Sequence, residues 1–218
     1  MSSTNSIIDK TRQYVESVLS GDGSGHDWWH VYRVWRLAVK LAEAEGADQE
    51  VVELAALLHD IADWKFHDGD VNKGPEEARR WLTQIGARPE VVSHVCDIIA
   101  TVSFKGAGVP TPMKTLEGKV VQDADRLDAI GAVGIARTFA YGGHKNRLMY
   151  HPDQKPVLHG SFEEYKNNRG HTINHFYEKL LLLKERMNTA SGKKLAEDRH
   201  RFMEVFLGRF YKEWEGTL

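Results

Sequence analysis

The chain has 218 residues, of which 41% are hydrophobic and 28% are charged. This length and composition predict one globular domain that can bury a sizeable core. Lys and Arg number 29 against 31 Asp and Glu, and the resulting net charge of −2 gives no case for a nucleic-acid footprint. Nucleic acid is therefore not an expected partner.

The cysteine count and the N-terminal residues bear on the cellular compartment. Cys96 is the only cysteine, so no disulfide can form within the chain, which fits a reducing compartment. The opening stretch MSSTNSIIDKTRQYV has no apolar run of signal-peptide length, and no segment approaches the ~20 apolar residues that span a bilayer. We expect a cytoplasmic protein with no membrane partner, and the sequence leaves its oligomeric state open.

Apolar residues that recur every three or four positions predict an all-α fold, and no segment shows the alternation of a β-strand. The first helix stops at GDGSG, and the second begins at the N-cap Asp27 and ends at Gly46. The other predicted helices span about 48–63, 75–85, 91–102, 115–141, 170–188 and 191–215. A loop rich in Gly, His and Pro covers about 142–160, where a short hairpin is an alternative.

A polar group ends the third predicted helix, in the stretch LLHDIADWK. On a helix His59 and Asp63 share one face, with Asp60 beside them, and His59 continues the inward apolar line. A buried carboxylate is costly unless it is paired or binds a metal. Adjacent His and Asp can give one nitrogen and one oxygen to the same divalent ion, so the stretch favours a metal site.

Two other predicted helices carry side chains of the same kind. His30 lies on the inward line of the second helix, and Asp125 follows two valines in the long segment. With His59 and Asp60 they give two neutral imidazoles and two carboxylates, whose charge a divalent cation balances. Each residue alone fits an ordinary role, as a core histidine or a surface acid, and it is the joint pattern that favours a metal site.

The order His30…His59-Asp60…Asp125 resembles the HD domain, the superfamily of metal-dependent phosphohydrolases. The stretches GHDWWHVYRV, ALLHDIADWK and DADRLDAIGAVGIAR are similar to its YpgQ/YedJ-like bacterial branch, and the similarity extends from about residue 25 to 203. The resemblance implies one all-helical domain over 1–218 with the metal at the centre of the bundle. It also implies hydrolysis of a phosphoester or phosphoanhydride, and for this branch of a nucleoside triphosphate to monophosphate and pyrophosphate.

The resemblance also suggests catalytic residues. Asp63 lies one turn beyond Asp60, where HD nucleotidases place an acid that orients or deprotonates water, so it is the candidate general base. Lys65 is a candidate to neutralise phosphate, with a solvated loop lysine as the alternative. Arg33, one turn from His30, is a candidate substrate contact. For Asp128 we expect either a hydrogen bond to a metal-bound histidine or a structural pair with a nearby arginine, Arg126 or Arg137.

In the second half of the chain, the stretch HTINHFYEKLLLLKERM is also similar to the branch. We expect Asn174, His175 and Lys179 to contact substrate phosphates, because an amide, an imidazole and an ammonium can all donate to phosphate oxygens. The alternative places Asn174 and His175 near a helix cap and lets Lys179 pack its stem along the core.

One divalent ion is favoured, Mn²⁺ or Mg²⁺ first, with Co²⁺, Ni²⁺, Fe²⁺ and Zn²⁺ as alternatives. Two-metal HD enzymes recruit extra histidines between the HD pair and the last Asp, where this chain has only His67 and His94. The expected partner is a small phosphate-containing substrate, a nucleotide first. Three rival functions stay open: an HD nucleotidase or phosphodiesterase acting on another phosphoester, a di-iron HD oxygenase, and a non-catalytic nucleotide-binding module.

Overall fold

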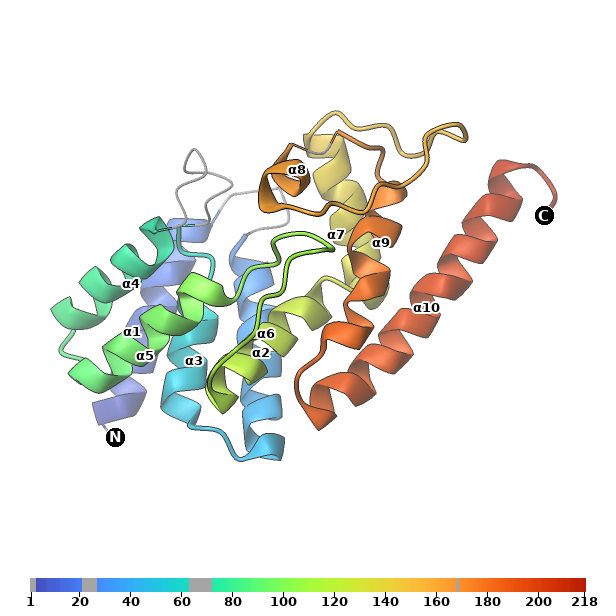
Figure 1. Ribbon diagram of the computed structural model, residues 1–218. Coiled ribbons are helices and arrows are strands. Elements are labelled where there is room, and N and C mark those ends of the chain that lie inside the picture. Colours follow the sequence, from blue (N-terminus) through green and yellow to red (C-terminus); the bar gives the residue numbers. More distant parts are fainter. Residues whose placement is uncertain (1–2, 21–26, 63–71, 168) are drawn as a thin grey trace. The chain divides into compact units, whose positions relative to one another are not determined.

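The computed structural model describes residues 3–20, 27–62, 72–167 and 169–218, and within these ranges every regular element is helical (Figure 1). The α-helices are α1 (Ser3–Leu19), α2 (Trp28–Glu45), α3 (Gln49–Leu58), α4 (Lys73–Gln84), α5 (Pro89–Thr101), α6 (Leu116–Asp128), α7 (Gly131–His144), α8 (Phe162–Lys166), α9 (Asn174–Glu178) and α10 (Ala190–Trp214). Two short 3-10 helices, η2 (Leu180–Leu182) and η3 (Lys184–Arg186), follow α9. The all-α prediction is confirmed.

The chain folds into two compact units. The first consists of residues 1–104 with 110–125, and the second of residues 105–109 with 126–218. The single domain over 1–218 stays a prediction. None of the helices in the described ranges is long and apolar enough to cross a membrane.

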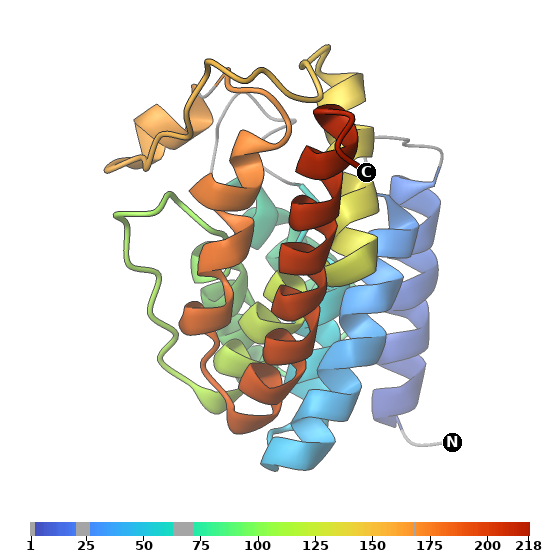
Figure 2. The same ribbon diagram turned by 90° about the vertical axis from the view of Figure 1, so that its right-hand side faces the viewer.

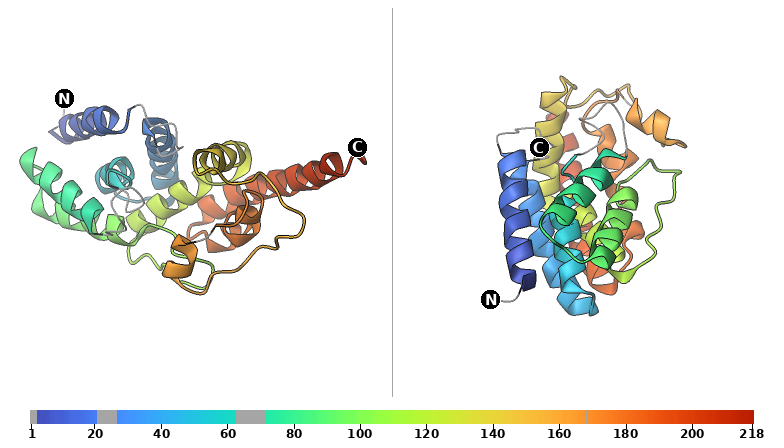
Figure 3. Two further views of the ribbon diagram at one scale, coloured as in Figure 1. Left: turned by 90° about the horizontal axis from the view of Figure 1, so that it is seen from above. Right: turned by 90° about the vertical axis from the view of Figure 1, so that its left-hand side faces the viewer.

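α3 is the central helix of the first unit. It packs against α1, α2 and α5, and α1, α2 and α3 are seen nearly end-on in the left panel of Figure 3. Seven of its ten residues are buried, which requires a sequence that is apolar on almost every side. Because α3 is enclosed by its neighbours, the residue that follows it, His59, is buried as well.

The second helix, α2, begins and ends where the sequence predicts. The Asp27 side chain accepts a hydrogen bond from the backbone N–H of His30 at 2.9 Å, and Gly46 takes the left-handed conformation that ends the helix. α6 is tied to the same unit by buried Gln122, whose Nε2 donates to the carbonyls of Val102 and Thr111 at 3.2 and 3.1 Å. The cap at Asp27 fixes the start of α2, and the Gln122 contacts hold the middle of α6, and both helices carry predicted ligands.

The third predicted helix is shorter than expected. α3 ends at Leu58 instead of near residue 63, and residues 59–62 form a turn. The backbone N–H of Ile61 donates to the carbonyl of Leu58 at 3.2 Å, a three-residue spacing that is tighter than an α-helix. His59 and Asp60 therefore lie on a turn instead of on the helix, and Asp63, which was predicted to share a helical face with His59, lies outside the described residues.

The long segment predicted over 115–141 is two helices, α6 and α7. Ile130 between them is extended, and Gly131 takes a left-handed φ of 77° that favours glycine. A Cβ on Gly134 would lie 2.2 Å from the carbonyl oxygen of Ala129, so the start of α7 also needs a residue without a side chain there. The apolar period continues across this turn, which is why periodicity alone did not reveal it.

The helix predicted near 170–188 is also interrupted. α9 ends at Glu178, Lys179 leaves the helical conformation with φ −141° and ψ −60°, and η2 and η3 follow. The buried carboxylate of Glu178 accepts a hydrogen bond from the backbone N–H of Val157 at 3.1 Å. The predicted inward stripe is nevertheless correct, because the following residues are all buried: Ile173, Phe176, Leu180, Leu183 and Met187.

α10 is the longest helix of the second unit and packs against α7 and η3 (Figure 2). An aromatic cluster joins these elements, with Phe139 of α7 6.0 Å from Phe206 of α10 and 6.2 Å from Phe176 of α9 between ring centroids. The segment 145–160 contains no strand, so the hairpin alternative is not observed. It is held instead by side chains, chiefly those of His171, Asn174 and Glu178.

Candidate metal centre

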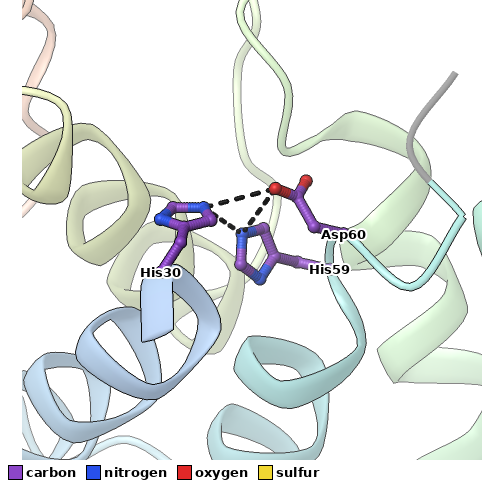
Figure 4. Close-up of side chains that lie close together, drawn as sticks. All are labelled: His30, His59 and Asp60. Atoms are coloured by element: carbon purple, nitrogen blue, oxygen red, sulfur yellow. Dashed lines mark hydrogen bonds and ion pairs between the residues drawn. The ribbon is translucent and has the colours of Figure 1, made fainter. Parts of the chain in front are cut away.

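Three side chains from two chain segments point toward one another in the first unit (Figure 4). His30 stands in the first turn of α2, and His59 and Asp60 follow the end of α3. The Nε2 atoms of the two imidazoles are 3.2 Å apart. Asp60 Oδ2 lies 3.2 Å from His30 Nε2 and 3.6 Å from His59 Nε2.

Asp125, in the last turn of α6, reaches the same point. Its Oδ1 lies 3.6 Å from His30 Nε2 and 3.8 Å from His59 Nε2. The two imidazoles are 1% exposed, whereas the side chains of Asp60 and Asp125 are 12% and 29% exposed. Asp125 therefore lies beside both imidazoles, and the two carboxylates are the more exposed side of the site.

A backbone contact orients one of the imidazoles. His59 Nδ1 lies 2.8 Å from the carbonyl oxygen of Ala56. Because a carbonyl can only accept, Nδ1 carries the proton, and in the neutral ring Nε2 turns its lone pair toward His30 and Asp60. Outer contacts of this kind fix the tautomer and orientation of metal-ligating histidines.

The spacing of the donor atoms fits a shared ion. Four ligands at ~2.1 Å from one divalent ion lie ~3.0–3.5 Å from one another at octahedral or tetrahedral angles. The donor atoms of His30, His59 and Asp60 lie 3.2–3.6 Å apart, which fits this range, and Asp125 Oδ1 lies 3.6 and 3.8 Å from the two imidazole nitrogens. Two imidazole nitrogens with carboxylate oxygens form a mixed set that suits a first-row divalent metal.

Other predicted site residues are placed less directly. Asp63 and Lys65 lie outside the described residues. Arg33 is half-buried, one turn along α2 from His30. Asp128, in the second unit, pairs with Arg137 at 2.9 Å, which is the structural alternative that the sequence had left open for it. Burial lowers the pKa of neighbouring Arg199, and the negative charge of Asp128 partly offsets that shift.

The second-unit candidates Asn174, His175 and Lys179 lie in and just after α9. Asn174 is buried, and its Nδ2 donates to the carbonyl of Gln154 at 3.3 Å while its backbone N–H donates to His171 Nδ1 at 3.2 Å. His175 and Lys179 are half-buried. The amide of Asn174 therefore holds the 145–160 segment, and substrate contact by these three residues stays a prediction.

The histidine that a second iron would need has other neighbours. His94 Nε2 lies 2.9 Å from Thr115 Oγ1 and 3.7 Å from Glu117 Oε2. Among the described residues, the compact His/Cys/Asp/Glu group consists of His30, His59 and Asp60 and does not include His94. His67 lies outside the described residues.

Two hydrogen bonds that hold the site histidines were not predicted from the sequence. The Ala56 carbonyl that orients His59 is a backbone group, which no residue pattern reveals. Asp27 was predicted as a helix cap, and the structure adds that the N–H it binds belongs to His30. The Asp-x-x-His spacing was the available signal, since an N-cap side chain bonds the amide two or three residues on.

Comparison with known proteins agrees with this architecture. The HD domain family matches residues 28–130, which contain all four converging side chains. The chain belongs to the HD-domain proteins. Within them it is YpgQ-like, being 41% identical to Bacillus subtilis YpgQ over 210 residues, or 95% of this chain and 94% of that one.

Solved structures show the same fold. A crystal structure of Bacillus subtilis YpgQ in complex with ADP is 39% identical, with 97% of each chain covered and a TM-score of 0.77. A Lactobacillus plantarum protein reaches a TM-score of 0.86 at 38% identity, with 96% of this chain and 97% of that one covered. An HD-superfamily hydrolase from Bacillus thuringiensis is 45% identical, with 97% and 98% covered and a TM-score of 0.74.

Proposed function

We propose that this protein is a divalent-metal-dependent phosphohydrolase that converts nucleoside triphosphates to monophosphates and pyrophosphate. The observation that carries the proposal is the compact group of His30, His59 and Asp60, with Asp125 Oδ1 within 3.8 Å of both imidazole Nε2 atoms. The ADP complex of YpgQ and the hydrolase from Bacillus thuringiensis support a nucleotide ligand and a hydrolytic reaction.

In this proposal His30, His59, Asp60 and Asp125 hold one divalent ion, Mn²⁺ or Mg²⁺ first. When bound, such an ion polarises phosphoryl oxygens and lowers the pKa of a coordinated water. The chain supplies the geometry, because the cap at Asp27 fixes the backbone at His30 and the Ala56 carbonyl orients the imidazole of His59 before substrate arrives.

Other predicted residues supply the proton and phosphate contacts in this proposal. Asp63 accepts a proton from the attacking water, whose oxygen bonds to the α-phosphorus while the bond from that phosphorus to the bridging oxygen breaks. Lys65 and Arg33 neutralise phosphate oxygens, and His30 stands in the first turn of α2, where backbone dipoles favour an anion. In the same proposal Asn174, His175 and Lys179 also donate to phosphate oxygens, and Asp128 has a structural role in its pair with Arg137.

A substrate panel tests this function. The purified protein is assayed with ribo- and deoxyribonucleoside mono-, di- and triphosphates and with simple phosphoesters, each with Mg²⁺, Mn²⁺, Co²⁺ or Ni²⁺. Pyrophosphate and orthophosphate are resolved by ion chromatography. We expect metal-dependent turnover of triphosphates with one pyrophosphate released per monophosphate.

Each alternative function would give a different outcome in that experiment. Orthophosphate as the sole inorganic product would make the protein a nucleotidase of another kind, and turnover confined to other phosphoesters would make it a phosphodiesterase or phosphatase. Tight nucleotide binding without turnover in any metal would indicate a binding module. Two irons per chain with an oxygen-dependent product would indicate the oxygenase, for which neither His94 nor the donor group offers support.

A further inference from the structure

Two consecutive tryptophans begin α2, and the structure places them in opposite environments. Trp28 is 5% exposed and belongs to the core, whereas Trp29 is 61% exposed and is the most exposed tryptophan in the described residues. Tryptophan is highly buried on average, so core packing does not account for Trp29. Single exposed apolar residues are nevertheless common, and the neighbours of Trp29 decide what its ring can do.

Trp29 lies on the flank of α2 that leads to the metal centre. It precedes the candidate ligand His30 in the sequence, and Arg33 follows one turn later. At 100° per residue, Trp29 and Arg33 are about 40° apart around the helix, and His30 lies about 60° beyond Arg33. Exposure falls in the same order, because Trp29 is exposed, Arg33 is half-buried and His30 is buried. The flank therefore presents an aromatic ring, a cation and a metal ligand in succession.

A nucleotide carries the groups that match this succession. Its phosphates suit a metal ion and a guanidinium, and its base offers a flat π-face at the other end of the molecule. A helix with its side chains is ~10–12 Å wide, so the arc from His30 to Trp29 spans roughly 9 Å. A sugar and a base placed end to end can cover that span while the phosphate stays at the metal centre.

An aromatic neighbour supports the ring of Trp29. Its centroid lies 5.8 Å from that of Tyr32 in a T-shaped contact. Tyr32 in turn contacts buried Trp28 at 5.9 Å and Trp35 at 6.1 Å. Edge-to-face contacts of this kind are favourable, and they anchor the exposed ring to the core through Tyr32. A side chain that is already held loses less conformational freedom when a ligand stacks on it.

We propose that Trp29 stacks on the base of a nucleotide whose phosphates are bound at the metal centre. The inference rests on the proposed function and adds the residue that holds the base. Stacking needs only a π-face, so Trp29 accepts every base, and it holds the larger ring of a purine more tightly than that of a pyrimidine.

Equilibrium binding tests the stacking without relying on turnover. Isothermal titration calorimetry of the full chain with Mn²⁺ compares the α,β-methylene analogues of ATP and CTP with inorganic tripolyphosphate, which has phosphates but no base. We expect Trp29→Ala to raise the dissociation constant of both nucleotides by ~5–100-fold, more for the purine, since base–aromatic stacking supplies an effect of this size. The dissociation constant of tripolyphosphate should stay within ~2-fold, because the lost contact is to the base.

Two further variants separate stacking from a structural role. Trp29→Phe keeps an aromatic face and should bring nucleotide affinity back to within ~5-fold of wild type. Trp214→Ala is the matched control, because Trp214 is also well exposed, at 47%, and belongs to the second unit. It should leave the affinity of all three ligands unchanged. Circular dichroism and the unfolding temperature show whether each variant is folded.

Tryptophan fluorescence gives a direct signature of the contact. A base stacked on Trp29 should quench part of the emission of the wild-type protein, and tripolyphosphate should not. The quenching should disappear in Trp29→Phe, although that variant still binds the nucleotide. Quenching of equal size in wild type and Trp29→Phe would assign the contact to another tryptophan and overturn the proposal.

The remaining outcomes distinguish this inference from the proposed function. Unchanged nucleotide affinity in Trp29→Ala, or an equal loss for tripolyphosphate, would overturn the stacking and leave the phosphohydrolase proposal standing. Nucleotide binding that depends on Trp29, without turnover of the natural triphosphates, would support the stacking and reject only the hydrolysis. Wild-type protein that binds neither nucleotides nor tripolyphosphate with any divalent metal would overturn both.

Discussion

The two units of the molecule each bury a histidine and use it differently. In the first unit His59 gives one nitrogen to a carbonyl at 2.8 Å and turns the other toward His30 Nε2 at 3.2 Å. In the second unit both ring nitrogens of His171 make structural hydrogen bonds. Nε2 lies 3.1 Å from the Gln154 carbonyl oxygen, and Nδ1 accepts from the Asn174 backbone N–H at 3.2 Å.

The difference shows what makes a buried histidine a candidate ligand. Burial does not distinguish the two, since His59 is 5% and His171 3% exposed. What differs is whether a ring nitrogen faces other lone pairs, as His59 does beside Asp60, or faces complementary donors and acceptors. Lone pairs that face one another repel, and a cation bound between them removes that repulsion. Ring nitrogens that already have hydrogen-bond partners need no further ligand.

The largest expected effect, a loss of both metal and activity, comes from removing the predicted metal ligand Asp60. Asp60→Ala should leave less than a tenth of the bound metal and lower activity by more than the ~10–100-fold typical of losing an outer-shell partner. The helical circular dichroism should change little, because Asp60 lies on a turn after α3. Metal content by mass spectrometry checks this prediction, and full metal occupancy in the variant would remove Asp60 from the ligand set.

The next variant separates metal holding from chemistry. Asp63→Asn keeps the side-chain shape but cannot take a proton, so turnover should fall by ~10²-fold or more with the metal retained. Steady-state kinetics and metal analysis on the same sample measure both quantities. Near-normal turnover would give Asp63 a structural role.

Replacing the structural histidine, His171, should lower stability and leave metal binding unchanged. His171→Leu removes the partner of the Gln154 carbonyl and of the Asn174 N–H, which should lower the free energy of unfolding by ~1–3 kcal/mol. Metal content should be unchanged. Urea titration measures the stability, and a loss of bound metal without a loss of stability would show that His171 is not the structural histidine described above.

Lys179→Ala has the smallest expected effect and tests whether the second unit contacts substrate. If the ammonium binds phosphate, KM should rise by up to ~10-fold, more for triphosphates than for monophosphates because more negative charge is involved. Metal content is the internal control. Unchanged kinetics with lowered stability would show that Lys179 only packs its stem along the core.

The sequence predicted the helices and the converging side chains better than the breaks between helices. The stripe of α2 and its caps at Asp27 and Gly46 are local signals, and the structure has them as predicted. The breaks depend on tertiary contacts. The apolar period continues through Ile130, and Glu178 ends α9 where its side chain binds the Val157 N–H, a contact that no local pattern encodes.

The candidate site was predictable for a similar reason. His30, His59, Asp60 and Asp125 are polar residues placed on apolar lines, and such exceptions are visible in a sequence. The position of Asp63 relative to them was argued from a helix that ends at Leu58, and both Asp63 and Lys65 lie outside the described residues. Their roles rest on the family resemblance and on the kinetic test above.

The most direct test of the central claim is anomalous diffraction at the manganese edge from crystals grown with Mn²⁺. We predict one strong peak bonded at ~2.0–2.3 Å to His30 Nε2, His59 Nε2 and a carboxylate oxygen of both Asp60 and Asp125. A peak bonded to other residues, or crystals that hold Mn²⁺ with any of these four side chains turned away from it, would contradict it.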